Sequence, residues 1–126
     1  MNLATEKRKI DEILKKDYDH EIPDTLRSKD FQKAFKNLLK KMFPECKIIP
    51  SSIWCEANGF IKTPEGKCVY YSTNDYRWRP WDRNILIRTA KDEKDYIGGG
   101  NHYANLEELQ DQINWLFTTQ IKKEGV

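Results

Sequence analysis

The fold class follows from a hairpin pattern in residues 53–73, IWCEANGFIKTPEGKCVYYST. Residues 53–62 alternate with a two-residue period, which is typical of a β-strand with two different faces. The turn that follows is TPEG at 63–66, where proline presets φ and glycine supplies the left-handed conformation that closes a hairpin. Residues 67–73 are predicted to form the return strand.

The two sides of the first hairpin strand differ in size and polarity. One side carries mostly small residues, which let a helix approach closely: Ile53, Cys55, Ala57, Gly59 and Ile61. The other side carries larger or polar residues: Trp54, Glu56, Asn58 and Phe60. We therefore expect the small side to face helices and the other side to be open. Large aromatic residues on an open face need a cover, and a binding partner is one such cover.

Helices are predicted on both sides of this hairpin in the sequence. Residues 5–18 carry a narrow apolar stripe. A second helix, capped by Asp24 or Ser28, has apolar residues at i, i+3 and i+4 and ends at Pro44. The last helix is predicted to start at Asn105, the first residue of an Asn-led capping box.

Two further strands are expected, one short strand over 46–49 and one over 84–90, with the glycine run 98–100 as a loop. The order α-α-β-β-β-α, with 46–49 as a fourth strand, predicts an antiparallel three- to four-stranded meander with helices on one face. That architecture belongs to the α+β class. The length of 126 residues suits one domain, so residues 1–126 are predicted to be a single α+β domain.

Composition excludes several functional classes. The chain has 22 basic and 20 acidic side chains, and its net charge of +2 is too small for the whole molecule to act as a polycation. No apolar run reaches the ~18–20 residues that span a bilayer, and no secretory signal pattern is present. The three cysteines, Cys46, Cys55 and Cys68, show no C-x-x-C spacing. We therefore predict a cytoplasmic protein without membrane contact, metal or cofactor.

The main candidate for a binding surface is the segment 76–88, YRWRPWDRNILIR, which has four arginines and one acidic residue. Arginine forks onto phosphate, and aromatic rings stack on bases with ~1–3 kcal/mol per base. The predicted anchors are Arg77, Trp78, Arg79, Trp81 and Arg83, extended across the sheet by Arg88, Trp54 and Phe60. A structural interpretation competes, in which the tryptophans fill the edge of the core. Because four arginines supply few phosphate contacts, that interpretation is favoured for the segment taken alone.

Catalysis is an alternative function, with His102 as the acid–base group and Cys55 or Glu56 beside it. No spacing of nucleophile, base and orienting group is visible, and neither histidine of the chain sits in an H-x-x-x-H frame. The sequence therefore identifies no catalytic residue and no metal ligand. A third alternative is a purely structural subunit of a homodimer.

Residues 87–103, IRTAKDEKDYIGGGNHY, together with residues 54–60, WCEANGF, resemble small uncharacterised proteins carried by conjugative and phage elements of Gram-positive bacteria. The likeness covers residues 53–117. It implies context and no catalytic residues: accessory proteins of such elements are often small non-enzymatic binders, including inhibitors of host defence nucleases. The leading hypothesis is a non-catalytic interaction domain, and its partner, a protein or a nucleic acid, stays open.

Overall fold

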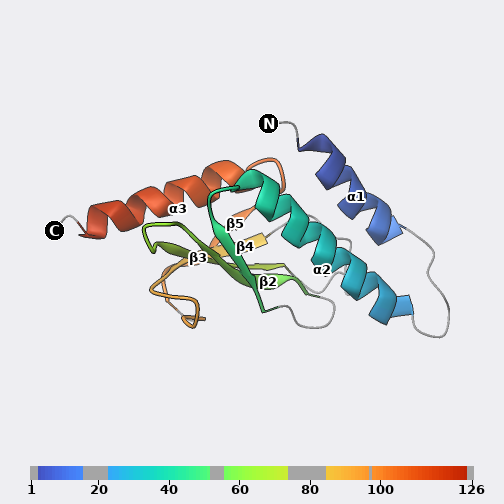
Figure 1. Cartoon of the computed structure of the whole chain (residues 1–126), viewed down its shortest axis with the longest axis horizontal. Helices are drawn as coiled ribbons and strands as arrows, with labels where there is room; N and C mark the ends of the chain where they lie inside the picture. The colour runs from blue at the N-terminus through green and yellow to red at the C-terminus, as the bar shows by residue number, and fades with distance from the viewer. Residues whose placement is uncertain (1–2, 16–22, 52–55, 74–84, 97, 125–126) are drawn as a thin grey trace.

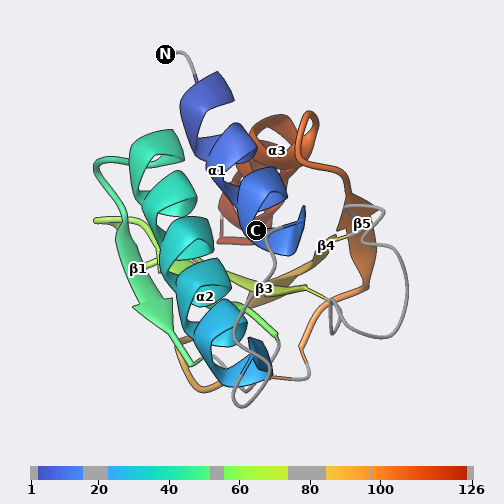
Figure 2. The ribbon, with the colours of Figure 1, turned by 90° about the vertical axis from the view of Figure 1, so that its right-hand side faces the viewer.

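A computed structural model describes residues 3–15, 23–51, 56–73, 85–96 and 98–124 (Figure 1). The apolar stripes of the sequence form α1 (Ala4–Lys15), α2 (Pro23–Met42) and α3 (Leu109–Glu124). α2 and α3 lie across one face of a β-sheet, and α1 packs beside α2 (Figure 2). Within the described residues, no helix is long and apolar enough to cross a membrane.

The start of α2 differs from the prediction. The helix begins at Pro23, before the predicted caps Asp24 and Ser28, and Ser28 is buried within it. Proline suits the first helical position because its fixed φ matches the helix and its missing N–H has no partner there anyway. The helix ends at Met42, just before Pro44, as the sequence predicts.

The capping box before α3 forms as expected. The Glu108 backbone N–H donates to Asn105 Oδ1 at 2.9 Å, and the Asn105 N–H donates to Glu108 Oε1 at 3.3 Å. The regular helix starts only at Leu109, so the box lies on the turn that leads into the helix. Its hydrogen bonds satisfy backbone donors that a helix start leaves free.

The sheet is an antiparallel meander whose strand order follows the chain. Its strands are β1 (Lys47–Pro50), β2 (Asn58–Lys62), β3 (Cys68–Thr73), β4 (Ile85–Ala90) and β5 (His102–Ala104). The predicted α+β class and the helices on one face are confirmed. The predicted strand count was too low, because the three residues of β5 are too few for a periodic pattern.

The central hairpin closes as the sequence predicts. The Thr63 N–H donates to the Lys67 carbonyl at 2.9 Å, and Gly66 has a φ of 93°. β2 is shorter than expected and begins at Asn58, after two described residues without strand structure.

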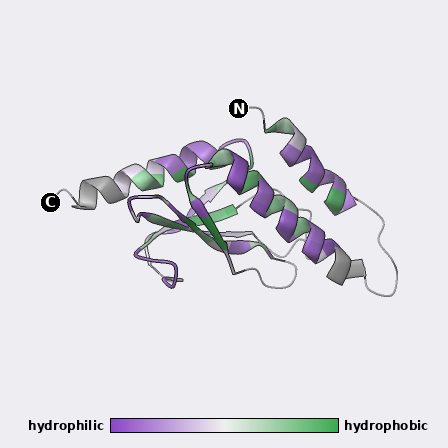
Figure 3. Cartoon of the chain, viewed as in Figure 1, coloured by the Kyte–Doolittle hydropathy of each residue, from purple (hydrophilic) through white to green (hydrophobic). Residues whose placement is uncertain are grey.

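The main core lies between the sheet and the helices. α1 and α2 each carry hydrophobic and hydrophilic residues along their length (Figure 3), and the apolar ones face inward. The largest fully buried side chains of this core are Tyr71, Phe31, Phe35, Ile10, Leu38, Leu39, Ile61, Ile85, Ile87, Leu106 and Leu109. Each such side chain adds about 1.5–3 kcal/mol of transfer free energy to folding.

Gly59 has a different role from the one predicted. We expected it to let a helix approach, but a Cβ atom at this position would collide with the Ile49 carbonyl oxygen on β1 and crowd the Tyr71 hydroxyl. Its φ of 154° also favours glycine. Gly59 thus makes room for a neighbouring strand. Ala57, on the same side of the chain, does pack in the helix-covered core.

A buried carboxylate joins α1 to α2. The Glu6 side chain is 6% exposed, and Lys41 Nζ donates to its Oε1 at 2.8 Å, while Lys9 Nζ lies 3.7 Å from its Oε2. The hydrogen bond from Lys41 lowers the pKa of Glu6 below its ordinary value, against the opposing effect of burial. Glu6 is therefore held ionised at neutral pH.

Candidate functional site

The candidate site is built on the sheet face opposite the helices. Paired residues of an antiparallel sheet share a face, and the register aligns Phe60 on β2, Tyr70 on β3 and Arg88 on β4. We call this side the helix-free face; its central strands also present Cys68, Ala90 and Leu86. Figure 1 shows the three helices on the other side of the sheet.

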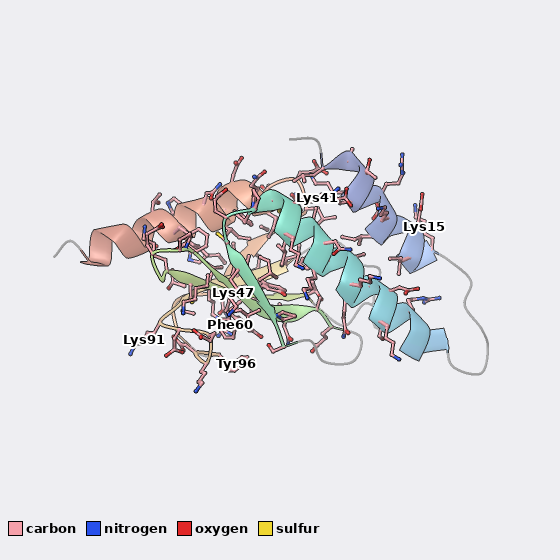
Figure 4. The ribbon with its side chains drawn as sticks, in the orientation of Figure 1. Lys15, Lys41, Lys47, Phe60, Lys91 and Tyr96 are labelled. Atoms are coloured by element: carbon pink, nitrogen blue, oxygen red, sulfur yellow. The ribbon has the colours of Figure 1, made fainter. Side chains whose placement is uncertain are left out.

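The aromatic residues of this face are covered by the chain itself. Phe60 is fully buried and Tyr70 is 7% exposed. The ring of Tyr96, from the segment after β4, packs edge-on at 5.1 Å from Phe60 and 5.7 Å from Tyr70. Figure 4 shows Tyr96 and Phe60 on the side of the sheet away from the helices. The sequence suggested a partner as the cover for Phe60, and the structure supplies Tyr96.

The segment that carries Tyr96 is ordered by its own carboxylates. Asp95 accepts the backbone N–H groups of Lys91 at 3.0 Å and Gly98 at 2.8 Å, and Asp92 accepts that of Lys94 at 2.8 Å. These acidic residues therefore fold the loop and are not a free negative patch. The glycine run that follows is a loop, as predicted.

Gly99 lets the loop pass close to β4. Its φ is 69°. A Cβ atom added at this position would lie 2.5 Å from the Thr89 hydroxyl oxygen and 2.7 Å from the Thr89 carbonyl oxygen, which is too close for either contact. A side chain at this position would push the loop away from the strand, and Tyr96 with it.

Arg88 lies at the end of the buried aromatic row. Its guanidinium carbon is 4.7 Å from the centre of the Tyr70 ring, a cation–π contact. The Nε atom is buried and has no hydrogen-bond partner among the described residues. Arginine Nε–H groups are donors, so this one is an unsatisfied buried donor in a side chain that is itself half-buried.

Lysines lie around the row formed by Phe60, Tyr70 and Arg88, and one of them forms an ion pair with a carboxylate. Lys62 Nζ lies 3.3 Å from Glu93 Oε2, with Lys47 opposite Lys62 on β1. The pKa of Glu93 is lowered by its own backbone N–H and then by the hydrogen bond and charge of Lys62. Lys47, Lys91 and Lys94 are exposed. The described charged side chains around this face are therefore five cations, Lys47, Lys62, Arg88, Lys91 and Lys94, and three carboxylates, Asp92, Glu93 and Asp95.

The described part of the chain has three exposed large apolar or aromatic residues, Tyr96 at 45%, Tyr103 at 62% and Trp115 at 49%. Tyr103 on β5 pairs with Leu86, so it belongs to the helix-free face. Trp115 on α3 packs edge-on against His102, 5.1 Å between ring centres, on the other side of β5. Two of the three thus lie on the face of Arg88.

Most of the predicted binding residues lie outside the part of the chain that the structure describes. Trp54, Arg77, Trp78, Arg79, Trp81 and Arg83 lie outside the described residues, whereas Phe60 and Arg88 share one row. Sequence reasoning missed Tyr70, Tyr96 and Tyr103 as parts of the site. Only the register could reveal Tyr70 and Tyr103, and Tyr96 reaches the face through a loop whose path no local pattern encodes.

The residues of the catalytic alternative do not converge. His102 pairs with Ile87, and the register continues through Tyr71 to Gly59. Three strand spacings of ~4.8 Å put His102 about 14 Å from Gly59, and Glu56 lies before Gly59 in the chain. Cys55 lies outside the described residues. Among the described residues, no three His, Cys, Asp or Glu side chains gather as a metal site would require.

The described cysteines are poor nucleophiles. Burial raises the pKa of the Cys46 and Cys68 thiols, which keeps both protonated at neutral pH. Cys68 is fully buried in the small cluster with Phe60 and Ala90, where it packs as a small apolar residue.

A groove lies on the helix side of the domain. It has a volume of about 320 Å³ between α1 and α2, and its lining includes Glu6, Lys9, Ile13, Asp30 and Lys33. Its best-buried charge, Glu6, already has two lysine partners. The groove therefore presents no unsatisfied group of Glu6 to a ligand.

No family model, curated protein or solved structure matches this chain. The resemblance to proteins of mobile elements stays a prediction from the sequence. The chemistry of the helix-free face carries the functional argument.

Proposed function

We propose that this protein is a non-catalytic interaction domain whose helix-free face contacts a macromolecular partner. The observation that carries the proposal is Arg88, stacked on Tyr70 with a buried Nε that lacks a partner in the described chain, on the same face as the exposed rings of Tyr96 and Tyr103. Binding hot spots are enriched in three residue types: tyrosine, arginine and tryptophan.

The geometry supports binding because part of the surface is preorganised. The Arg88 guanidinium packs over the Tyr70 ring, and Phe60 and Tyr70 hold the Tyr96 ring by its edge contacts. Side chains that are already ordered lose less rotamer entropy when a partner binds. The sequence alone adds a context to this proposal. In that context, the protein is a cytoplasmic accessory protein of a mobile element that acts on a host defence nuclease.

Site-specific photo-crosslinking tests the proposal. A photoreactive phenylalanine analogue replaces Tyr103 in one variant and Trp115 in a matched control, which is similarly exposed but lies on the other side of β5. We expect covalent adducts in cells from the Tyr103 position and none from the Trp115 position. Adducts from neither position, or equal adducts from both, contradict a binding role for this face.

The same experiment separates the homodimer alternative. An adduct of twice the monomer mass from Tyr103, together with a dimer in sedimentation equilibrium at low protein concentration, would replace the proposal by self-association. A monomer in sedimentation, with adducts to other molecules, supports the interaction domain.

A further inference from the structure

We infer that the partner of the helix-free face is a single-stranded nucleic acid, with bases stacked on Tyr96 and Tyr103 and phosphates bound by Arg88 and the surrounding lysines. This inference rests on the proposed function and names the chemistry of its partner. Three properties of the face support it: the small exposed apolar area of the described residues, the exposed aromatic rings, and the positions of the charges.

Among the described residues, the cluster at the centre of this face exposes little apolar surface. Phe60 and Cys68 are fully buried, Tyr70 and Ala90 are 7% exposed, and Tyr96 packs on Phe60 and Tyr70. Interfaces between proteins centre on an apolar core from which lysine is depleted. This face instead offers exposed rings among lysines, which is the composition of a surface that binds a nucleic-acid strand.

The exposed rings suit unpaired bases. Tyr103 is 62% exposed, and Tyr96 is 45% exposed while its edge contacts to Phe60 and Tyr70 hold it in place. Every base has a π-face, so such rings bind single strands with little sequence preference. In a duplex, the base faces are stacked on each other and closed to these side chains. The rings therefore favour a single strand over a duplex.

The charges around the rings complement a phosphate backbone. Lys47, Lys91 and Lys94 are exposed, and Arg88 keeps its Nε–H without a partner in the described chain. The nearby carboxylates are fewer than the cations: Glu93 pairs with Lys62, and Asp92 and Asp95 keep their charge while they accept loop N–H groups. Among the described residues, a polyanion thus meets five cationic side chains and three carboxylates around this face.

Fluorescence anisotropy with labelled oligonucleotides of about 12 nucleotides, poly-dT, poly-U and a duplex of equal length, tests the inference. We expect both single strands to bind more tightly than the duplex, with an affinity that falls steeply as salt rises. Tyr103→Ala should weaken single-strand binding about tenfold at every salt concentration. Tyr103→Phe, which keeps the ring, should restore most of it, and Trp115→Ala should change nothing.

Arg88 has its own signature in the salt dependence. Arg88→Gln should weaken binding and reduce the slope of log K against log salt by ~0.7, the value for one phosphate contact with a single strand. Tyr103→Ala should leave that slope unchanged. Thermal melting of each variant without oligonucleotide checks that the fold is intact, and Arg88→Lys, which keeps the charge, should retain the slope.

The outcomes separate this inference from the proposed function. If neither single strand binds, or if binding survives both Tyr103→Ala and Arg88→Gln, the inference is overturned. Crosslinks from Tyr103 to a protein, without oligonucleotide binding, overturn the inference and leave the interaction domain in place. Absence of both crosslinks and oligonucleotide binding overturns both.

Discussion

The two faces of the same sheet are buried in different ways. On one face, α2 and α3 enclose a large core that includes Phe35 and Tyr71, whose rings stack 5.8 Å apart. On the other face, the cover of Phe60 comes from a loop residue, Tyr96, which itself stays 45% exposed. Among the described residues, the sheet thus has one side packed under helices and one thinly covered side.

This difference shows how a small domain can combine stability with a contact surface. A helix covers a sheet with its own continuous apolar stripe and leaves polar side chains outward. A loop that contributes one ring leaves that ring, and neighbouring cations such as Arg88, within reach of solvent and partners. Stability is therefore expected to depend mainly on the first face, and recognition on the second.

The largest effect is expected in the helix-covered core. Phe35→Ala should lower the free energy of unfolding by about 4 kcal/mol, because the cavity lies between a helix and a sheet that cannot easily close it. Urea unfolding measures the loss. The exposed Lys33 on the same helix supplies the control, and Lys33→Ala should stay within about 0.5 kcal/mol of the wild type.

The matching substitution on the helix-free face should cost less. Phe60 is buried as completely as Phe35, but its loop cover can settle into the space, so Phe60→Ala should lower the free energy of unfolding by about 3 kcal/mol. The same urea experiment compares the two. An equal or larger loss for Phe60→Ala would break the distinction between a helix-covered and a thinly covered face.

A smaller effect is expected from the carboxylate that joins α1 to α2. Because the folded-state pKa of Glu6 lies below its ordinary value of 4.5, its contribution to stability is present above that value and is lost as pH falls through the lower folded-state pKa. Glu6→Gln should therefore lower the melting temperature at neutral pH and flatten its fall in acid. Thermal melts across pH measure both.

The control for Glu6 lies on the same helix. Glu12 is 68% exposed and 3.7 Å from Arg8, one turn away. Exposed pairs of this kind contribute little, so Glu12→Gln should leave both the melting temperature and its pH dependence nearly unchanged. An equal change in both variants would mean that surface charge, and not the buried contact with Lys41, sets the acid response.

The smallest effect on stability is expected where the effect on binding is largest. Tyr103 is 62% exposed, so Tyr103→Ala should change the free energy of unfolding by less than about 0.5 kcal/mol. Thermal melting measures it beside the anisotropy experiment. A loss of several kcal/mol would show that Tyr103 is part of the fold, and the division between a stabilising face and a contact face would fail at β5.

Local patterns predicted much of the fold. The end of α2 at Pro44, the turn that closes at Gly66 and the capping box at Asn105 each depend on residues within a few positions of one another, so the chain carries their signal directly. β5 escaped prediction because three residues hold no usable period. The start of α2 was misplaced because several residues near it can act as caps.

The candidate site was predictable only in part. Arg88 and Phe60 were identified from their residue types, but their common row with Tyr70 depends on strand register. The cover by Tyr96 joins residues 36 positions apart. Asp92 and Asp95 hold the loop that carries this ring through hydrogen bonds to backbone N–H groups within four residues.

By itself, the sequence determined the three helices and four of the five described strands, where the hairpin turns, and that the class is α+β, because periodicity and turn chemistry act over a few residues. Tertiary structure alone decided that Gly59 makes room for β1, that Tyr96 packs on Phe60 and Tyr70, and that Arg88 stacks on Tyr70 with a buried Nε that has no partner among the described residues. Those contacts join strands and loops distant in the chain, and their energies arise only once the sheet has brought them together.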